Sequence, residues 1–322
     1  MSLDFTVAIP TYNGESRLSK VLERLQIQQG VKQLIWEIII VDNNSTDGTA
    51  KLIQEYQTNC KSDIPLRYFF EREQGLAFAR NRAIIEAHGE LVGFLDDDNL
   101  PAPDWVISAY KFGQDYPKAG IYSSQIHGLF EFEPSENLKP ILFYLAINER
   151  GCKPLLYEPC KKGFPPGAGL VVRRHVWNAY VPKRLVLVGR VGSSMLAGED
   201  SEALVYIHKA GWEIWYNPAM VIEHIIPQWR LEKKYLISLM RGIGLSRFHL
   251  RMLLLKSWQR PFAFFVYLIK DVLKLLSYYI RYRTKLKDDV VVSCERERLF
   301  ATLISPFYLW KLRISNYLKT DK

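Results

Sequence analysis

The chain has 322 residues, 48% of them hydrophobic and 24% charged, which is long enough for one large or two medium folded domains. Its four cysteines form no C-x-x-C pair, which argues against a disulfide framework or a zinc site and favours a reducing compartment. No basic-then-apolar leader precedes the first apolar run, so we predict no signal peptide and a cytoplasmic location.

Short β-branched or apolar runs alternate with helical periodicity along the first hundred residues. Such alternation is typical of βαβ units, so we predict an α/β fold with a mostly parallel central sheet flanked by helices. No G-x-G-x-x-G follows the first run and no P-loop is present, which excludes a dinucleotide dehydrogenase and a P-loop phosphotransferase. The expected strands are 5–9, 36–41, 66–70 and 91–95, and the expected helices are 15–29, 49–58 and 76–88.

Polar residues follow three of these strands. Ligands of an open parallel sheet bind beyond the carboxyl ends of its strands, so we expect the three clusters to share one crevice. Three adjacent carboxylates repel each other unless a cation lies among them, and a divalent metal completed by a diphosphate is a common solution. A solvated acidic turn is the plainer interpretation of the acidic cluster taken alone. The clusters are Thr11-Tyr12-Asn13, Asp42-Asn43-Asn44 and Asp96-Asp97-Asp98.

The following segment, to residue 225, is richer in proline and has weaker patterns. We expect a helix over 104–115, strands at 120–124 and 170–172, and two short final strands at 214–218 and 220–224. A further helix opens with Gly198-Glu199-Asp200-Ser201-Glu202, where acidic residues also suit a capping role. His224 closes the last strand, and a histidine there is by itself more often an ordinary polar residue than a ligand.

Together these segments resemble the family-2 glycosyltransferases, which have the GT-A fold. The resemblance covers about residues 1–225 and implies a nucleotide-binding half (1–100), an acceptor half (101–225) and, beyond it, a basic amphipathic helical extension (226–322). The chain is also similar to cyanobacterial hormogonium-polysaccharide and exopolysaccharide glycosyltransferases. The residues that carry the resemblance are V-A-I-P-T-Y-N (7–13), I-I-V-D-N-N-S-T-D-G-T (39–49), G-L-A-F-A-R-N (75–81), F-L-D-D-D-N (94–99), G-E-D (198–200) and His224.

The resemblance implies a nucleotide-diphospho-sugar donor, UDP-linked by family habit, and a Mn²⁺ or Mg²⁺ ion. By position, Asp98 and His224 would bind the metal, and Asp200 would be the general base. Asp96 and Asp97 would lie nearer the ribose or behind the metal ligands, and Arg80 would face the base pocket or brace the acidic strand end. The other implied donor-binding residues are Pro10, Thr11, Tyr12, Asn13, Asp42 and Asn44.

The resulting hypothesis is a metal-dependent, inverting glycosyltransferase that acts on a saccharide or lipid-linked acceptor in surface polysaccharide biosynthesis. Processive family members carry Q-x-x-R-W, whereas this chain has only Gln228-Trp229-Arg230, which suggests single additions. A nucleotidyltransferase acting on sugar phosphates is an alternative, although the loop after the first strand lacks the basic residue it would need. A non-catalytic sugar-binding protein is another, against which the intact acidic set argues.

The C-terminal segment is strongly basic. Residues 226–322 carry 20 Lys and Arg against 7 Asp and Glu, although the whole chain has a net charge of only +9. Residues 262–280 approach the length of a membrane span, but each charge at its centre would cost roughly 2.5–3.5 kcal/mol. We therefore expect two amphipathic helices, 262–280 and a second over 299–319 broken at Pro306, at the inner face of the plasma membrane. Packing on the catalytic domain or on a second subunit is the alternative, and we expect no nucleic-acid partner.

Overall fold

A computed structural model describes residues 3–59, 63–159, 163–192, 194–286 and 288–320. Its described residues group into two compact units. The sheet unit comprises residues up to Glu131, Leu145–Leu185 and Tyr206–Ile226, and the helical unit comprises Phe132–Tyr144, Val186–Val205 and the chain from Pro227. Cys152 and Cys294 are free thiols, while the predictions for Cys60 and Cys160 lie outside the described residues.

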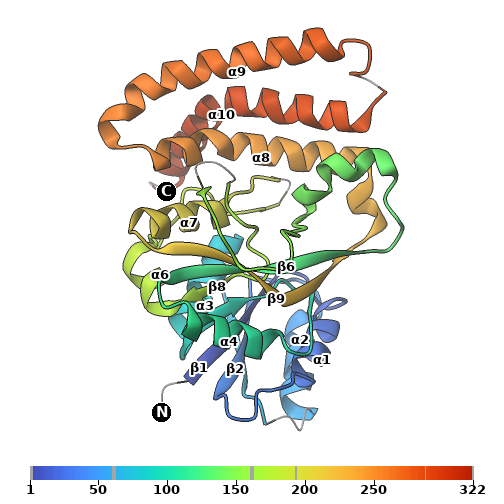
Figure 1. Cartoon of the computed structure of the whole chain (residues 1–322), viewed down its shortest axis with the longest axis vertical. Helices are drawn as coiled ribbons and strands as arrows, with labels where there is room; N and C mark the ends of the chain where they lie inside the picture. Colours follow the sequence, from blue (N-terminus) through green and yellow to red (C-terminus); the bar gives the residue numbers. More distant parts are fainter. Residues whose placement is uncertain (1–2, 60–62, 160–162, 193, 287, 321–322) are drawn as a thin grey trace. The chain divides into compact units, whose positions relative to one another are not determined.

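The N-terminal half of the sheet is parallel, in the strand order β3-β2-β1-β4 (Figure 1). All seven residues of β2 are buried, as expected for a strand that is covered on both faces. The strands are β1 (Leu3–Thr11), β2 (Trp36–Asp42), β3 (Leu66–Phe70) and β4 (Gly89–Phe94), and the helices between them are α1 (Leu18–Gln26), α2 (Thr49–Asn59) and α3 (Leu76–Glu86).

The other half makes the sheet mixed, because β8 pairs antiparallel with both β4 and β6 whereas β6 and β9 are parallel. The predicted α/β architecture with a central sheet and flanking helices is confirmed, and its parallel pairing is concentrated in the first half. The remaining strands are β5 (Asn99–Pro101), β6 (Ala119–Phe130), β7 (Leu155–Leu156), β8 (Val171–Arg173) and β9 (Glu213–Ile226), with helices α4 (Trp105–Asp115) and α6 (Arg174–Tyr180).

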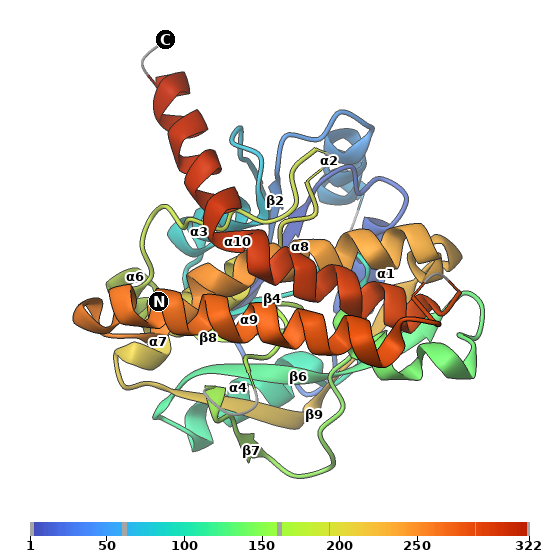
Figure 2. The ribbon, with the colours of Figure 1, turned by 90° about the horizontal axis from the view of Figure 1, so that it is seen from above.

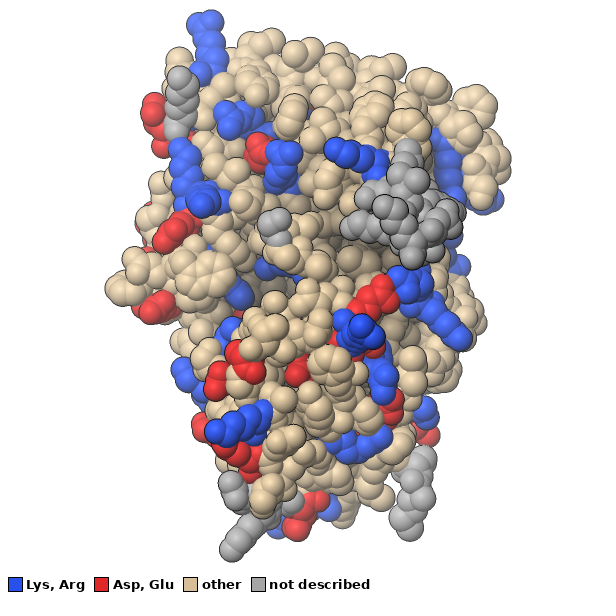
Figure 3. Space-filling model, turned by 180° about the vertical axis from the view of Figure 1, so that it is seen from behind, with Lys and Arg blue, Asp and Glu red and all other residues tan. Residues whose placement is uncertain are grey.

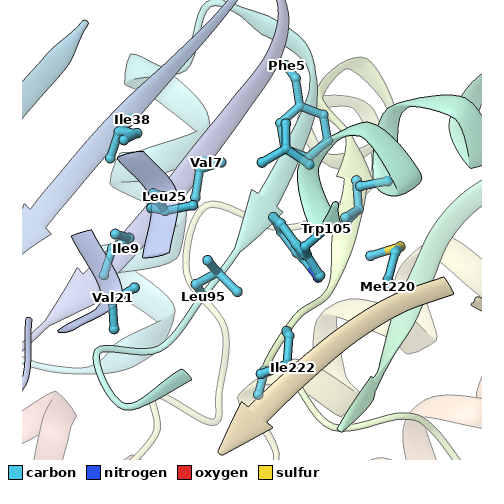
Figure 4. Packing of buried hydrophobic residues seen from close by; sticks show 14 of the residues in the cluster. Phe5, Val7, Ile9, Val21, Leu25, Ile38, Leu95, Trp105, Met220 and Ile222 are labelled. Atoms are coloured by element: carbon cyan, nitrogen blue, oxygen red, sulfur yellow. The ribbon is translucent and has the colours of Figure 1, made fainter. Parts of the chain in front are cut away.

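The core of the sheet unit is centred on Trp105, which is fully buried against Phe5 at a ring-centroid distance of 6.1 Å (Figure 4). A Cβ atom at Gly93 would lie 2.7 Å from the Trp105 ring, so only glycine leaves room for it in β4. The indole nitrogen of Trp105 donates to Ser124 Oγ at 2.9 Å, and this hydroxyl donates to Gly169 O at 2.7 Å. These contacts fix the position of β4, whose end carries the acidic cluster.

The expected strands differ from the structure at several places, since β6 extends to Phe130 and the two-residue strand β7 was not predicted. The two short final strands that we predicted are one 14-residue strand, β9, which continues past Pro218. The register against β6 shifts at this point, and Asn217 Oδ1 accepts a hydrogen bond from Ala219 N. A bulge therefore accommodates the proline without ending the strand. The short strand β5 was not predicted at all.

The helical unit is built on α8 (Lys233–Leu254), α9 (Arg260–Tyr282) and α10 (Val290–Thr320), which run alongside one another in both Figure 1 and Figure 2. A Cβ atom at Gly244 would lie 2.5 Å from Arg298 O, so glycine lets α8 approach α10 closely. The predicted break at Pro306 is wrong, since α10 continues through it. Ser305 bonds to Leu245 O and Leu309 is buried beside it, and this packing compensates for the lost backbone hydrogen bond.

No helix within the described ranges combines the length and the apolar character that crossing a bilayer requires.

Candidate active site

The three polar clusters lie at one edge of the sheet, because the strands that carry them are parallel neighbours. Thr11 pairs with Asp42 at the ends of β1 and β2. Leu95, one residue beyond β4, donates its N–H to Ala8 O in β1 at 3.0 Å. The expected convergence at the carboxyl ends of the strands is therefore present, and the acidic cluster follows directly on this edge.

The middle carboxylate of the acidic cluster is fully engaged by protein groups. Arg17 donates to Asp97 through Nε at 2.8 Å and through Nη2 at 2.9 Å, and Thr11 Oγ1 donates to Asp97 Oδ2 at 2.6 Å. The hydrogen bonds to Asp97 raise the pKa of Arg17, so the guanidinium stays charged. Asp97 therefore ties the end of β4 to the end of β1 and to α1, and it does so with both oxygens.

The first carboxylate, Asp96, lies 3.5 Å from Arg80 Nη2. Burial raises the pKa of Asp96, the charges of Asp98 and Asp97 raise it further, and Arg80 and His224 oppose the rise. Arg80 is itself buried, with its guanidinium over the Phe94 ring. Of the two roles considered for Arg80, this geometry corresponds to bracing the acidic strand end.

The third carboxylate, Asp98, lies beside His224 because β5 pairs with β9. Asn99 is opposite His224 in this antiparallel pair, and Ile225 N donates to Asp98 O at 2.9 Å. Asp98 Oδ2 is 3.5 Å from His224 Nε2, and both side chains are more than nine-tenths buried. Asn99 Nδ2 also donates to Asp98 Oδ1 at 3.1 Å, which fixes the rotation of the carboxylate.

The spacing of Asp98 and His224 fits a shared divalent cation. Carboxylate and imidazole ligands lie about 2.0–2.2 Å from a metal, so two of them on one ion are separated by less than about 4.4 Å. The described residues contain no group of three or more His, Cys, Asp or Glu side chains arranged to hold a metal. Asp98 and His224 could supply two ligands to such a cation, and oxygens of the nucleotide donor or water would then fill its remaining coordination positions.

The region that we predicted to bind the base is organised around Asp42. Ser45 N donates to Asp42 Oδ1 at 2.9 Å, and the Tyr68 hydroxyl donates to Asp42 Oδ2 at 3.0 Å. Burial and the neighbouring Asp42 charge raise the pKa of Tyr68 to about 12, so its hydroxyl stays protonated. Tyr12 is 48% exposed, whereas Pro10 is buried within β1.

Asn13 and Asn44 shape the loops, since both have the left-handed backbone conformation that asparagine tolerates, with φ of 50° and 64°. The Asn13 side-chain oxygen accepts a hydrogen bond from Thr46 N at 2.8 Å, which joins the loops after β1 and β2. Asn43 belongs to the predicted polar cluster after the second strand but was not named as a donor-binding residue. Its Oδ1 accepts from Gly75 N at 2.8 Å, which joins the second loop to the start of α3.

Asp200 belongs to the helical unit, in the first turn of α7 (Glu199–Lys209). In that turn, buried Glu202 accepts hydrogen bonds from Val186 N at 3.1 Å and Leu187 N at 2.7 Å. Glu202 also lies 2.9 Å from His249 of α8. These bonds anchor the turn that carries Asp200, while its role as general base stays a prediction.

Comparison with known proteins identifies relatives of the N-terminal part. The sequence profile of Glycosyl transferase family 2 matches residues 6–165. The chain is 33% identical over 141 residues to the uncharacterized glycosyltransferase YfnE of Bacillus subtilis, covering 41% of this chain and 34% of that protein. It is 38% identical over 96 residues to GalNAc(5)-diNAcBac-PP-undecaprenol beta-1,3-glucosyltransferase of Campylobacter jejuni, covering 29% of each. The chain thus spans about a third of the length of these relatives.

Two solved structures resemble the whole described fold. The mannosyltransferase PcManGT of Pyrobaculum calidifontis, in complex with GDP-Man and Mn²⁺, superposes with a TM-score of 0.59 at 20% identity over 96% of this chain and 88% of its own. The structure of residues 1–349 of TarS of S. aureus in complex with UDP superposes with a TM-score of 0.51 at 16% identity. The match covers 95% of this chain and 91% of that chain. These likenesses confirm the predicted GT-A fold.

Proposed function

We propose that this protein, whose residues 6–165 match the profile of Glycosyl transferase family 2, transfers a sugar from a nucleotide-diphospho-sugar with inversion. The observation that carries the proposal is the Asp98–His224 pair, 3.5 Å apart and buried, at the same sheet edge as Asp42. A metal pair beside a base-binding carboxylate suits a ligand that has a nucleobase at one end and a diphosphate at the other.

On the base side, Asp42 is held as an acceptor by Tyr68 and Ser45, so it can take a hydrogen bond from the base or the ribose. Tyr12 offers an exposed ring that can stack on the base. Arg80 and Arg17 hold Asp96 and Asp97 in place, which leaves Asp98 directed toward His224. Asp96 then faces the ribose or supports the metal ligands.

Asp98 and His224 would hold a Mn²⁺ or Mg²⁺ ion, which when bound would neutralise charge on the leaving diphosphate. Asp200 is proposed to accept the proton of the acceptor hydroxyl as the hydroxyl attacks the anomeric carbon. Attack opposite the leaving group inverts that carbon. General-base assistance of this kind contributes roughly 10²–10⁴-fold to the rate.

We propose a UDP-sugar as donor, since the TarS structure holds UDP, although PcManGT holds GDP-Man. The proposed acceptor is a saccharide or a lipid-linked glycan, and the C. jejuni relative is named for a lipid-diphosphate acceptor. The proposed setting is surface polysaccharide or exopolysaccharide synthesis at the cytoplasmic face of the plasma membrane. Similarity to hormogonium-polysaccharide enzymes stays a prediction.

A thermal-shift screen of UDP- and GDP-sugars, with and without Mn²⁺, tests the donor class. We expect one nucleotide series to raise the melting temperature, and Mn²⁺ to enlarge the shift. At a ligand concentration of 100 times Kd, binding adds about 2.7 kcal/mol to stability, which such a screen resolves. Absence of any shift with every nucleotide sugar at millimolar concentration would contradict the proposal.

A further inference from the structure

One face of helix α9 packs against the other helices of the helical unit. Leu275 is buried there, and Asp271 forms an ion pair with Arg251 of α8 at 2.7 Å. The Tyr278 hydroxyl donates to Val292 O of α10 at 3.2 Å. This side of α9 therefore has its packing and polar contacts within the unit.

The opposite face of α9 is apolar and exposed. Its large side chains recur every three or four residues over 18 positions, which places them in one stripe roughly 27 Å long. Monomeric proteins rarely leave a continuous apolar patch of this size in water, and patches that persist mark binding surfaces. The stripe consists of Phe262, Phe265, Ile269, Leu273, Leu276 and Ile280, each between 54% and 76% exposed.

Cations flank this outward stripe. Lys270, Lys274 and Arg281 are all exposed and lie along one of its edges by helical spacing. Asp271 is the one acidic residue of α9, and it is engaged on the inward side by Arg251. The face drawn in Figure 3 has Lys and Arg scattered among uncharged residues over its upper part, together with a few Asp and Glu. An apolar stripe edged by cations matches the interface of an anionic bilayer.

We infer that the outward stripe of α9 docks flat onto a membrane that contains anionic lipids. Aromatic and aliphatic side chains would enter the boundary between headgroups and acyl chains, while Lys270, Lys274 and Arg281 remain at the headgroups. A second copy of this protein, docking through the same face of α9, is disfavoured by charge. The helix presents no outward carboxylate that could pair with those cations across such a dimer. The inference rests on the proposed function only for the choice of the cytoplasmic leaflet.

Vesicle flotation of the full chain tests the docking face without any sugar donor. We expect the wild-type protein to float with phosphatidylcholine vesicles that contain phosphatidylglycerol. Ile269→Glu/Leu273→Glu should reduce the bound fraction at least about tenfold, because each substitution removes one buried aliphatic side chain from the interface. Ile85→Glu is a control, since Ile85 is a similarly exposed isoleucine on α3 of the sheet unit, with 68% of it exposed against 60% of Ile269. Equal loss in the control, or flotation unchanged in the double variant, would overturn the inference.

The cationic edge is tested by Lys270→Gln/Lys274→Gln. This variant should bind anionic vesicles several-fold more weakly, and its binding should depend less on salt than that of the wild type. Light scattering without lipid tests whether a second copy of the protein covers the stripe instead. A dimer that the Ile269→Glu/Leu273→Glu substitutions dissociate would identify this second copy and contradict membrane docking. Nucleotide binding measured on the same variants separates the two proposals, because it should be unchanged.

Discussion

Each of the three carboxylates that follow β4 has a different partner. Arg80 lies beside Asp96, Arg17 holds Asp97, and His224 faces Asp98. Arginines oppose the repulsion among these adjacent carboxylates at the first two positions, and the third carboxylate lies beside an imidazole with which it could share a cation. The cluster thus contains two carboxylates beside arginines and a third, Asp98, that faces the imidazole of His224.

Tyr68→Phe is expected to weaken nucleotide binding about fivefold. The substitution removes one hydrogen bond to Asp42, which corresponds to about 1 kcal/mol. Because Asp42 lies on the base side, calorimetry should give the same factor with and without Mn²⁺. The pKa of Tyr68 is raised to about 12, so its hydroxyl remains a donor throughout the range of about pH 6–9 and the effect should not vary with pH there.

Tyr56→Phe is the control for this prediction, since its hydroxyl makes only a long contact with Ser19 O at 3.5 Å, away from Asp42. Equal weakening in both variants would show that Tyr68 acts through general packing and not through Asp42.

Asp200→Asn is expected to reduce sugar transfer by roughly 10²–10⁴-fold while leaving nucleotide affinity unchanged, because a general base acts on the acceptor and not on the donor. Product release from the donor identified by the thermal-shift screen measures the rate. Glu199→Gln changes the neighbouring charge in the same helical turn and should keep most activity. Near-full transfer by Asp200→Asn would refute the assignment of the base.

The acidic residues were predictable from sequence because they directly follow an apolar strand. Their cationic partners were harder to identify. Arg17 is 80 positions from Asp97 and meets it only through the packing of α1 and β1 on β4. The charge argument did require a cation near the cluster, and the arginine at the start of the first helix was the available signal.

Among the elements, the pairing of β5 with β9 brings together Asp98 and His224, the proposed metal ligands. Three residues of β5 are enough to place Asn99 opposite His224, and Ile225 N then fixes the Asp98 carbonyl. Asn99 is fully buried, and its Oδ1 also accepts a hydrogen bond from Asp96 N at 3.1 Å. One amide side chain therefore orients both ends of the acidic cluster.

Asn99→Ala should therefore lower the affinity for Mn²⁺ several-fold and cost about 1–2 kcal/mol of folding stability through lost hydrogen bonds. Calorimetric titration with Mn²⁺ and urea unfolding measure the two effects. Asn148→Ala removes another buried, hydrogen-bonded asparagine from the sheet unit and should cost similar stability. If Asn148→Ala impaired Mn²⁺ binding equally, the effect would be one of stability and not of ligand orientation.

The periodic elements of the N-terminal half were predictable because each buried strand is a short apolar run between turn residues. The elements of the second half were harder to predict. Pro218 in β9 and Pro306 in α10 suggested interruptions, yet a bulge accommodates the first and packing against α8 outweighs the second. Strand β5, with three residues, is too short to give a periodic signal and depends on its partner β9.

At the scale of the whole molecule, each compact unit is built from segments that lie far apart in the sequence. We predicted sequential domains divided at residue 225, whereas contacts assign Phe132–Tyr144 and Val186–Val205 to the same unit as the C-terminal helices. The predicted general base, Asp200, lies in one of these segments, whereas the proposed metal ligands Asp98 and His224 lie in the sheet unit. Contacts between residues distant in sequence decide this grouping, and local patterns carry no information about them.

The central claim is that Asp98 and His224 together hold the cation on which donor binding depends. Calorimetric titration of UDP, or of the nucleotide preferred in the screen, with and without Mn²⁺ tests it most directly in wild type, Asp98→Ala, His224→Ala and the double variant. We predict that Mn²⁺ strengthens binding to the wild type, that either single substitution removes most of this gain, and that the double variant loses little more. A Mn²⁺-dependent gain that persists in the double variant would contradict the account.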